Sequence, residues 1–98
     1  MSDEHELKRQ ADRGDRAKRL LENELINEAF DKIESEIMDA WRNSPADAEQ
    51  ERYNAYLMYR LLMNFKGQFK QAVAHGEAAS KQLLQIRDPS KFKRMING

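Results

Sequence analysis

Apolar residues recur at helical spacing over most of this 98-residue chain. The first pattern is a row at every fourth position from Ala17 to Trp41, with Ile26 and Phe30 beside it. Such a row forms one face of an α-helix, and the strict alternation of a β-strand does not fit it. We therefore predict one helix over residues 15–43, about 40 Å long at about 1.5 Å per residue.

The second pattern is a seam of ten uncharged positions that alternate in steps of three and four, which is typical of a heptad repeat. Its members are Ala55, Met58, Leu62, Phe65, Phe69, Ala72, Gly76, Ala79, Leu83 and Ile86. Gly76 is either a helix C-cap or a close-packing point in a continuing, kinked helix. The unbroken phase favours continuation, or a tight turn into a short third helix over residues 77–87, before Asp88-Pro89 ends it.

The segment between the two patterns, residues 43–47, reads Asn-Ser-Pro-Ala-Asp. Ser44 is expected to cap the second helix, with Pro45 at its first position and Asp47 as the third residue of a capping box. A connection this short makes the two helices antiparallel neighbours.

The predicted fold is therefore all-α: an antiparallel, coiled-coil-like two-helix hairpin with a short third helical segment at its C-terminal end. Residues 17–88 form the hairpin domain, and residues 89–98 form a basic tail. Residues 1–16 are expected to be a charged, partly disordered or partly helical lead, because Gly14 interrupts a segment with little to bury.

Apolar positions on the two helices are the candidate contact residues. They are Leu21, Leu25, Phe30, Ile33, Ile37, Trp41, Met58, Leu62, Phe65, Phe69, Leu83 and Ile86. Further apolar side chains lie beyond the seam at Tyr53, Tyr56, Leu57, Tyr59 and Leu61. They either close the loop end of the hairpin with Trp41 or form a second contact face, which a homo-oligomer such as a dimeric four-helix bundle or a ring of hairpins would cover.

Charge is balanced over the whole chain, with 17 Lys plus Arg against 17 Asp plus Glu, but not along it. Residues 1–51 hold eight basic and 15 acidic residues, a net charge of −7, and residues 52–98 hold nine and two, a net charge of +7. We expect the two fields to fix pairing and register, within the hairpin or between subunits.

Two other interpretations of the charge stay open. The acidic first helix could mimic a nucleic-acid backbone and occupy a basic site on a host protein. Alternatively, Lys91, Lys93 and Arg94 of the tail could bind phosphates nonspecifically.

No catalytic, metal or cofactor signature is present, so we predict a protein that is not an enzyme and needs no cofactor. His5 and His75 have no second ligand at metal-binding spacing, and Glu24 and Glu28 lack the Glu-x-x-His element of carboxylate-bridged sites. The chain has no Cys, no signal-peptide pattern and no membrane-spanning run. We expect a soluble protein that acts inside the cell, with no membrane partner.

Four short stretches carry a resemblance to a protein group. They are A-x-x-L-L-E-N-E-L at residues 17–25, E-A-F-x-x-I-E at 28–34, A-W-R-x-S-P at 40–45 and D-x-E-x-x-R at 47–52, with a later G-x-A-A at 76–79. In these the chain resembles small helical proteins of tailed bacteriophages and prophages. The resemblance implies a phage protein of the bacterial host cytoplasm or the virion, from the packaging and head-assembly genes, that contacts another phage or host protein. It transfers no catalytic residues.

Overall fold

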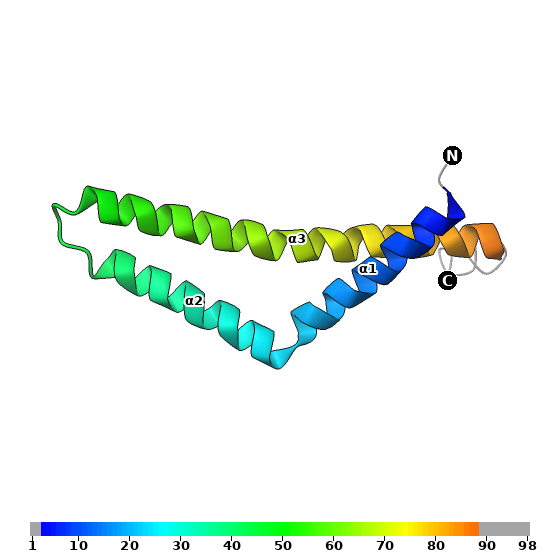
Figure 1. The fold of residues 1–98 in the computed structure, drawn as a ribbon, viewed down its shortest axis with the longest axis horizontal. Helices are drawn as coiled ribbons and strands as arrows, with labels where there is room; N and C mark the ends of the chain where they lie inside the picture. The colour runs from blue at the N-terminus through cyan, green and yellow to red at the C-terminus, as the bar shows by residue number, and fades with distance from the viewer. Residues whose placement is uncertain (1–2, 89–98) are drawn as a thin grey trace, which may run out of the picture. The chain divides into compact units, whose positions relative to one another are not determined.

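Three α-helices make up most of residues 3–88, the part of the chain that the computed structural model describes (Figure 1). They are α1 (Glu4–Glu22), α2 (Glu24–Arg42) and α3 (Glu49–Arg87). No strand occurs among these residues, so the predicted all-α class is confirmed. The predicted hairpin with a short third segment is wrong. A separate helix, α1, precedes α2, and residues 77–87 are the end of the 39-residue α3.

The predicted helix over residues 15–43 is interrupted at Asn23. The backbone of Asn23 is extended, with φ −71° and ψ 122°, and its side-chain oxygen accepts a hydrogen bond from the Ile26 amide at 3.0 Å. Asn23 is therefore the N-cap of α2. The side chain of Asn27 also donates to the carbonyls of Leu21 and Asn23, at 2.7 and 3.1 Å. The row of apolar residues does not reveal this break, because it keeps its spacing of four through Leu21 and Leu25.

The loop between α2 and α3 lies where the sequence predicts it, but its capping differs. The Ser44 hydroxyl donates to the Trp41 carbonyl at 2.7 Å, so it serves the C-terminal end of α2 and does not begin α3. The guanidinium of Arg52, on the first turn of α3, donates to the carbonyls of Pro45 and Ala46. The Arg52 side chain, which the predicted capping box did not include, thus holds the loop to the start of α3.

The helices form two compact units, and α3 contributes to both. One unit comprises Leu20–Gln68, in which α2 and the first half of α3 run antiparallel from the loop (Figure 1). Phe30 and Ile37 of α2, together with Ala55 and Leu62 of α3, are its buried apolar residues. The Phe30 and Phe65 rings pack with centroids 5.9 Å apart.

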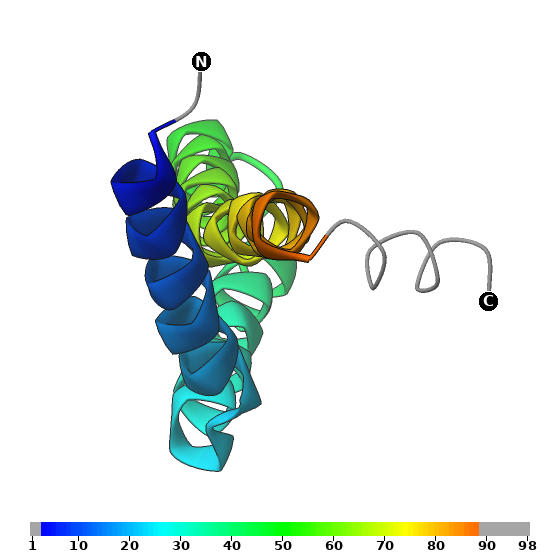
Figure 2. The ribbon, with the colours of Figure 1, turned by 90° about the vertical axis from the view of Figure 1, so that its right-hand side faces the viewer.

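The described part of the other unit comprises residues 3–19 and 69–88, in which α1 packs against the second half of α3 (Figure 2). Leu7 packs in one buried cluster with Ala79 and Leu83. Further along α1, a Cβ placed on Gly14 would lie 2.7 Å from the Gly76 Cα and 2.8 Å from the Ala72 carbonyl oxygen. The two backbones therefore touch at this crossing, and no side chain fits between them.

Gly76 is thus a close-packing residue inside a continuous helix, which is one of the two roles that the sequence left open. Neither it nor any other described glycine has a positive φ, so it is not a left-handed C-cap. Gly14 plays the same role on α1, where the sequence pointed to an interruption.

The segment predicted as a partly disordered or partly helical lead is helical from Glu4, and its Leu7 is only 4% exposed. Its charges support the helix, because acids precede bases by three or four residues. The resulting ion pairs are Glu6–Arg9, Asp12–Arg16 and Asp15–Arg19.

The Gly14–Gly76 crossing generates a stability prediction. Gly14→Ala and Gly76→Ala should each destabilise the protein by about 1–3 kcal/mol, since the new methyl group meets backbone that must move. Gly67→Ala is the matched control, because a Cβ there meets nothing within 4 Å. That change should stabilise α3 by up to about 1 kcal/mol through helix propensity. Thermal unfolding followed by circular dichroism measures all three, and equal effects at the three sites would contradict the crossing.

Candidate functional site

A groove of about 750 Å³ runs between α2 and the first half of α3 in the Leu20–Gln68 unit. Acidic residues of α2 line one wall, and tyrosines of α3 line the other. The lining includes Asp31, Glu34, Asp39, Trp41, Tyr56 and Tyr59. This side of the helix pair therefore carries both aromatic rings and carboxylates.

The acidic residues of α2 do not pair with α3. Within residues 3–88, Asp39 is the one α2 carboxylate in an ion pair, and its partner is Arg42 of the same helix, at 4.0 Å. Arg60 of α3 donates to the Tyr56 hydroxyl and lies over its ring, and the Lys66 ammonium reaches α2 at Phe30, 5.5 Å from the centre of the ring. Among the described residues, no ion pair therefore joins α2 to α3, and a role of the two charge fields in pairing and register, within the hairpin or between subunits, stays a prediction.

The predicted contact residues fall into three groups by exposure. Buried are Phe30, Ile37, Leu62 and Leu83; intermediate are Leu21 and Phe69; exposed are Leu25, Ile33, Trp41, Met58, Phe65 and Ile86. Lys91, Lys93 and Arg94 of the basic tail lie outside the described residues. Half of the seam in the Leu20–Gln68 unit is thus at the surface, because α2 covers the row of Ala55 and Leu62 and leaves the row of Met58 and Phe65 exposed.

Six exposed apolar side chains of α2 and the first half of α3 form a surface that we call the apolar face. It consists of Ile33, Tyr53, Leu57, Met58, Leu61 and Phe65, each between 44% and 71% exposed. Tyr53, Leu57, Leu61 and Phe65 follow one another at intervals of four, so they lie within an arc of about 120° of α3. The sequence had pointed to a second contact face through several of these residues.

Polar groups on the apolar face are mainly amides. On the same arc of α3 lie Asn54, Asn64 and Gln68, and Gln68 donates to Asn64 at 3.2 Å. Arg60 lies at the edge of this arc, where it lines a hollow with Leu61. The apolar face therefore offers apolar area and amide groups, with one base at its edge.

Other kinds of site have less support among the described residues. No group of three or more His, Asp or Glu side chains in this part of the chain is placed to hold a metal ion. His5 and His75 are both exposed and belong to different helices. Over the same residues, no helix has the length and apolar character needed to cross a membrane.

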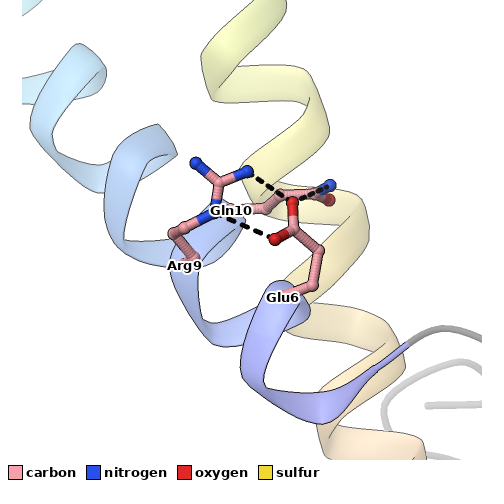
Figure 3. Close-up of polar contacts among 3 residues, drawn as sticks. All are labelled: Glu6, Arg9 and Gln10. Carbon is pink, nitrogen blue, oxygen red and sulfur yellow. Dashed lines mark hydrogen bonds and ion pairs between the residues drawn. The ribbon is translucent and has the colours of Figure 1, made fainter.

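The most closely bonded polar cluster of side chains lies on α1 (Figure 3). The Glu6 carboxylate accepts hydrogen bonds from Arg9 Nε at 2.9 Å and from Gln10 at 3.3 Å, and its other contact is with an Arg9 terminal nitrogen. The hydrogen bonds from Arg9 hold the pKa of Glu6 below its usual 4.5, and the Arg9 charge adds to the effect. As an exposed pair three residues apart, it supports the first turns of α1 and forms no pocket.

Comparison of the chain with models of known protein families, with curated proteins and with solved structures gives no match.

The Glu6–Arg9 pair generates a prediction about pH. Because the folded-state pKa of Glu6 is lowered, the pair favours the folded state above pH 4.5 and is lost as the pH falls through that lowered pKa. Arg9→Gln should raise the pKa of Glu6 toward 4.5, as followed by NMR titration of the Glu6 carboxyl. Arg13→Gln removes the same charge from α1 at a residue that does not contact Glu6. It should leave the pKa nearly unchanged, and an equal shift in both variants would contradict the pairing.

Proposed function

We propose that this chain is a non-enzymatic protein of a tailed bacteriophage that acts by helix-mediated protein–protein interaction, as an accessory of assembly or DNA packaging. The apolar face is the single observation that carries the interaction. The phage context rests on the resemblance of residues 17–52 to small phage and prophage proteins.

The size of the apolar face supports a role in binding. Six large side chains, each about half exposed, present on the order of 100 Å² apiece, or about 600 Å² together. That area is at the upper end of the roughly 300–600 Å² that the largest patch of a monomeric protein exposes, and such patches are often functional. Six side chains of this kind on one surface lower the free energy of the complex when a partner covers them.

The residues also suit a protein interface more than a site of chemistry. Tyr, Phe and Met are enriched where proteins bind one another, and charged residues are depleted at the centre of such surfaces. The apolar face has this composition, with Tyr53, Met58 and Phe65 among its members and charged residues at its edge. Amide groups such as Asn64 can supply hydrogen bonds at its edge.

Affinity capture from phage-producing cells tests the proposal. Tagged full-length protein should retain an identified head-assembly or packaging protein, and Leu61→Glu should reduce the recovery at least tenfold, because it places a charge in the apolar face. Leu25→Glu is the matched control. Leu25 is 72% exposed and Leu61 is 71% exposed, but Leu25 lies at the start of α2, two turns before Ile33 and outside the apolar face. Failure to retain any phage protein would contradict the proposed function.

The acidic side of α2, whose carboxylates make no ion pair with α3 within the described residues, favours a second candidate function. Its carboxylates line a groove with Trp41, Tyr56 and Tyr59, and α3 does not neutralise them. Such a surface could occupy the basic site of a host nucleic-acid enzyme as an inhibitor, through charges placed as on a nucleic-acid backbone.

Charge reversal tests this second candidate. The triple variant Glu28→Lys, Asp31→Lys and Glu34→Lys should lose the binding of any captured host nucleic-acid enzyme, and duplex DNA should displace that enzyme from the unaltered protein. Asp47→Lys, Glu49→Lys and Glu51→Lys make the same change of charge at the loop and the start of α3. Equal binding by the two triple variants would reject a role for the acidic helix.

A further inference from the structure

The α2 and α3 pair has two chemically distinct sides. The groove is lined by positions 31, 34, 35, 38 and 42 of α2 and by positions 56 and 59 of α3. At about 100° per residue, Ile33 lies on the other side of α2, and Met58, Leu61 and Phe65 lie on the other side of α3. The contact between Phe30 and Phe65 joins the two helices there. These four residues of the apolar face therefore lie on the side of the pair away from the acidic groove.

The charge of the surroundings favours a partner whose surface is also uncharged. Residues 20–68 hold five basic and ten acidic residues, a net charge of −5, yet the apolar face has no charged member. Two copies of a charged surface would repel when they meet, whereas the six residues of this face bring no charge to the contact. The charges nearest to them are of opposite sign, Glu36 on α2 and Arg60 on α3, and they lie at the edge of the face.

The area of the apolar face is also large enough for a contact between two copies. A self-complementary contact uses the same patch twice, so about 600 Å² on each copy amounts to about 1,200 Å² in total. Stable, specific interfaces bury about 1,200–2,000 Å². A single copy thus presents enough area for a dimer through side chains that are already exposed, without rearrangement of either helix.

We propose that a second copy of this chain covers the apolar face in a two-fold symmetric, antiparallel dimer, in which α2 and the first half of α3 of both copies form a four-helix contact. Leu61, the most exposed residue of the face and near its middle, lies close to the two-fold axis. Tyr53 of one copy then lies near the Phe65 end of the other. This inference deepens the proposed function, because it names the occupant of the same face.

The experiment measures the association of the purified full-length chain by sedimentation equilibrium, with no other protein present. The unaltered chain should dimerise, and Leu61→Glu should weaken dimerisation at least about 100-fold, because each dimer then buries two like charges near its axis. Leu25→Glu should dimerise as the unaltered chain does. Circular dichroism checks that both variants remain helical, as expected for two leucines that are more than two-thirds exposed.

A cysteine variant tests the symmetry without adding a charge. The chain has no Cys, so Leu61→Cys introduces a single thiol. A thiol near the axis should form an intermolecular disulfide under mild oxidation, since bridged Cα atoms lie about 5.5 Å apart. Leu25→Cys should cross-link much less at the same concentration.

The outcomes separate this inference from the proposed function. A chain that is monomeric at high concentration overturns the dimer, as does a dimer that Leu61→Glu leaves intact. If the monomeric chain still captures a phage protein through Leu61, another protein covers the face, and the proposed function stands without the dimer. A dimer that captures no phage protein supports the inference and contradicts the proposed function.

Discussion

A row of residues spaced by seven along α3 determines how the other two helices pack. Ala55 and Leu62 are buried against α2 in one unit, and Gly76 and Leu83 are buried against α1 in the other, with Phe69 between them in sequence. A repeat of seven keeps one narrow stripe in phase along a helix of 39 residues. The two units differ in the size of the side chains at the contact between the helices. Alanine and glycine bring α1 into backbone contact, whereas phenylalanine rings fill the space between α2 and α3.

The apolar face follows from this use of α3. A single helix laid on another covers only part of its circumference, and in the Leu20–Gln68 unit α2 lies over the row of Ala55 and Leu62. Met58 and Phe65, which continue the seam, are consequently exposed, as are Leu57 and Leu61 beside it. In the other unit the same second row is buried at Ala72 and Ala79, since the small side chains let α1 approach closely. Whether a row of the seam is buried thus depends on the size of its side chains and on the position of the neighbouring helix.

Long-range periodicity predicted more of this fold than local chemistry did. The unbroken seam predicted helix on both sides of Gly76 but left open whether it continues or turns there, and Pro45 predicted the loop, because both signals depend on spacing or on backbone geometry. The break at Asn23 was missed, since a capping side chain can replace one turn of helix without changing the row of apolar residues. The burial of α1 was not predicted, because it depends on Gly14 meeting Gly76, a contact between residues 62 positions apart that no local pattern contains. The candidate site was predicted in part: the extra apolar residues of α3 were identified, but which rows of the seam α2 would cover required the structure.

The net charge of the chain is zero, but its acidic and basic residues are unevenly distributed over the helices. Among the described residues, no ion pair joins α2 to α3. Arg52 binds loop carbonyls, and Arg60 and Lys66 lie against aromatic rings. The carboxylates of α2 consequently keep their field on the groove side, about half a turn away from the apolar face. Two surfaces of different chemistry thus share one pair of helices, and an exposed side chain on one of them can be changed with little effect on the other. This physical separation allows self-association and the binding of a basic partner to be examined independently in the same folded chain.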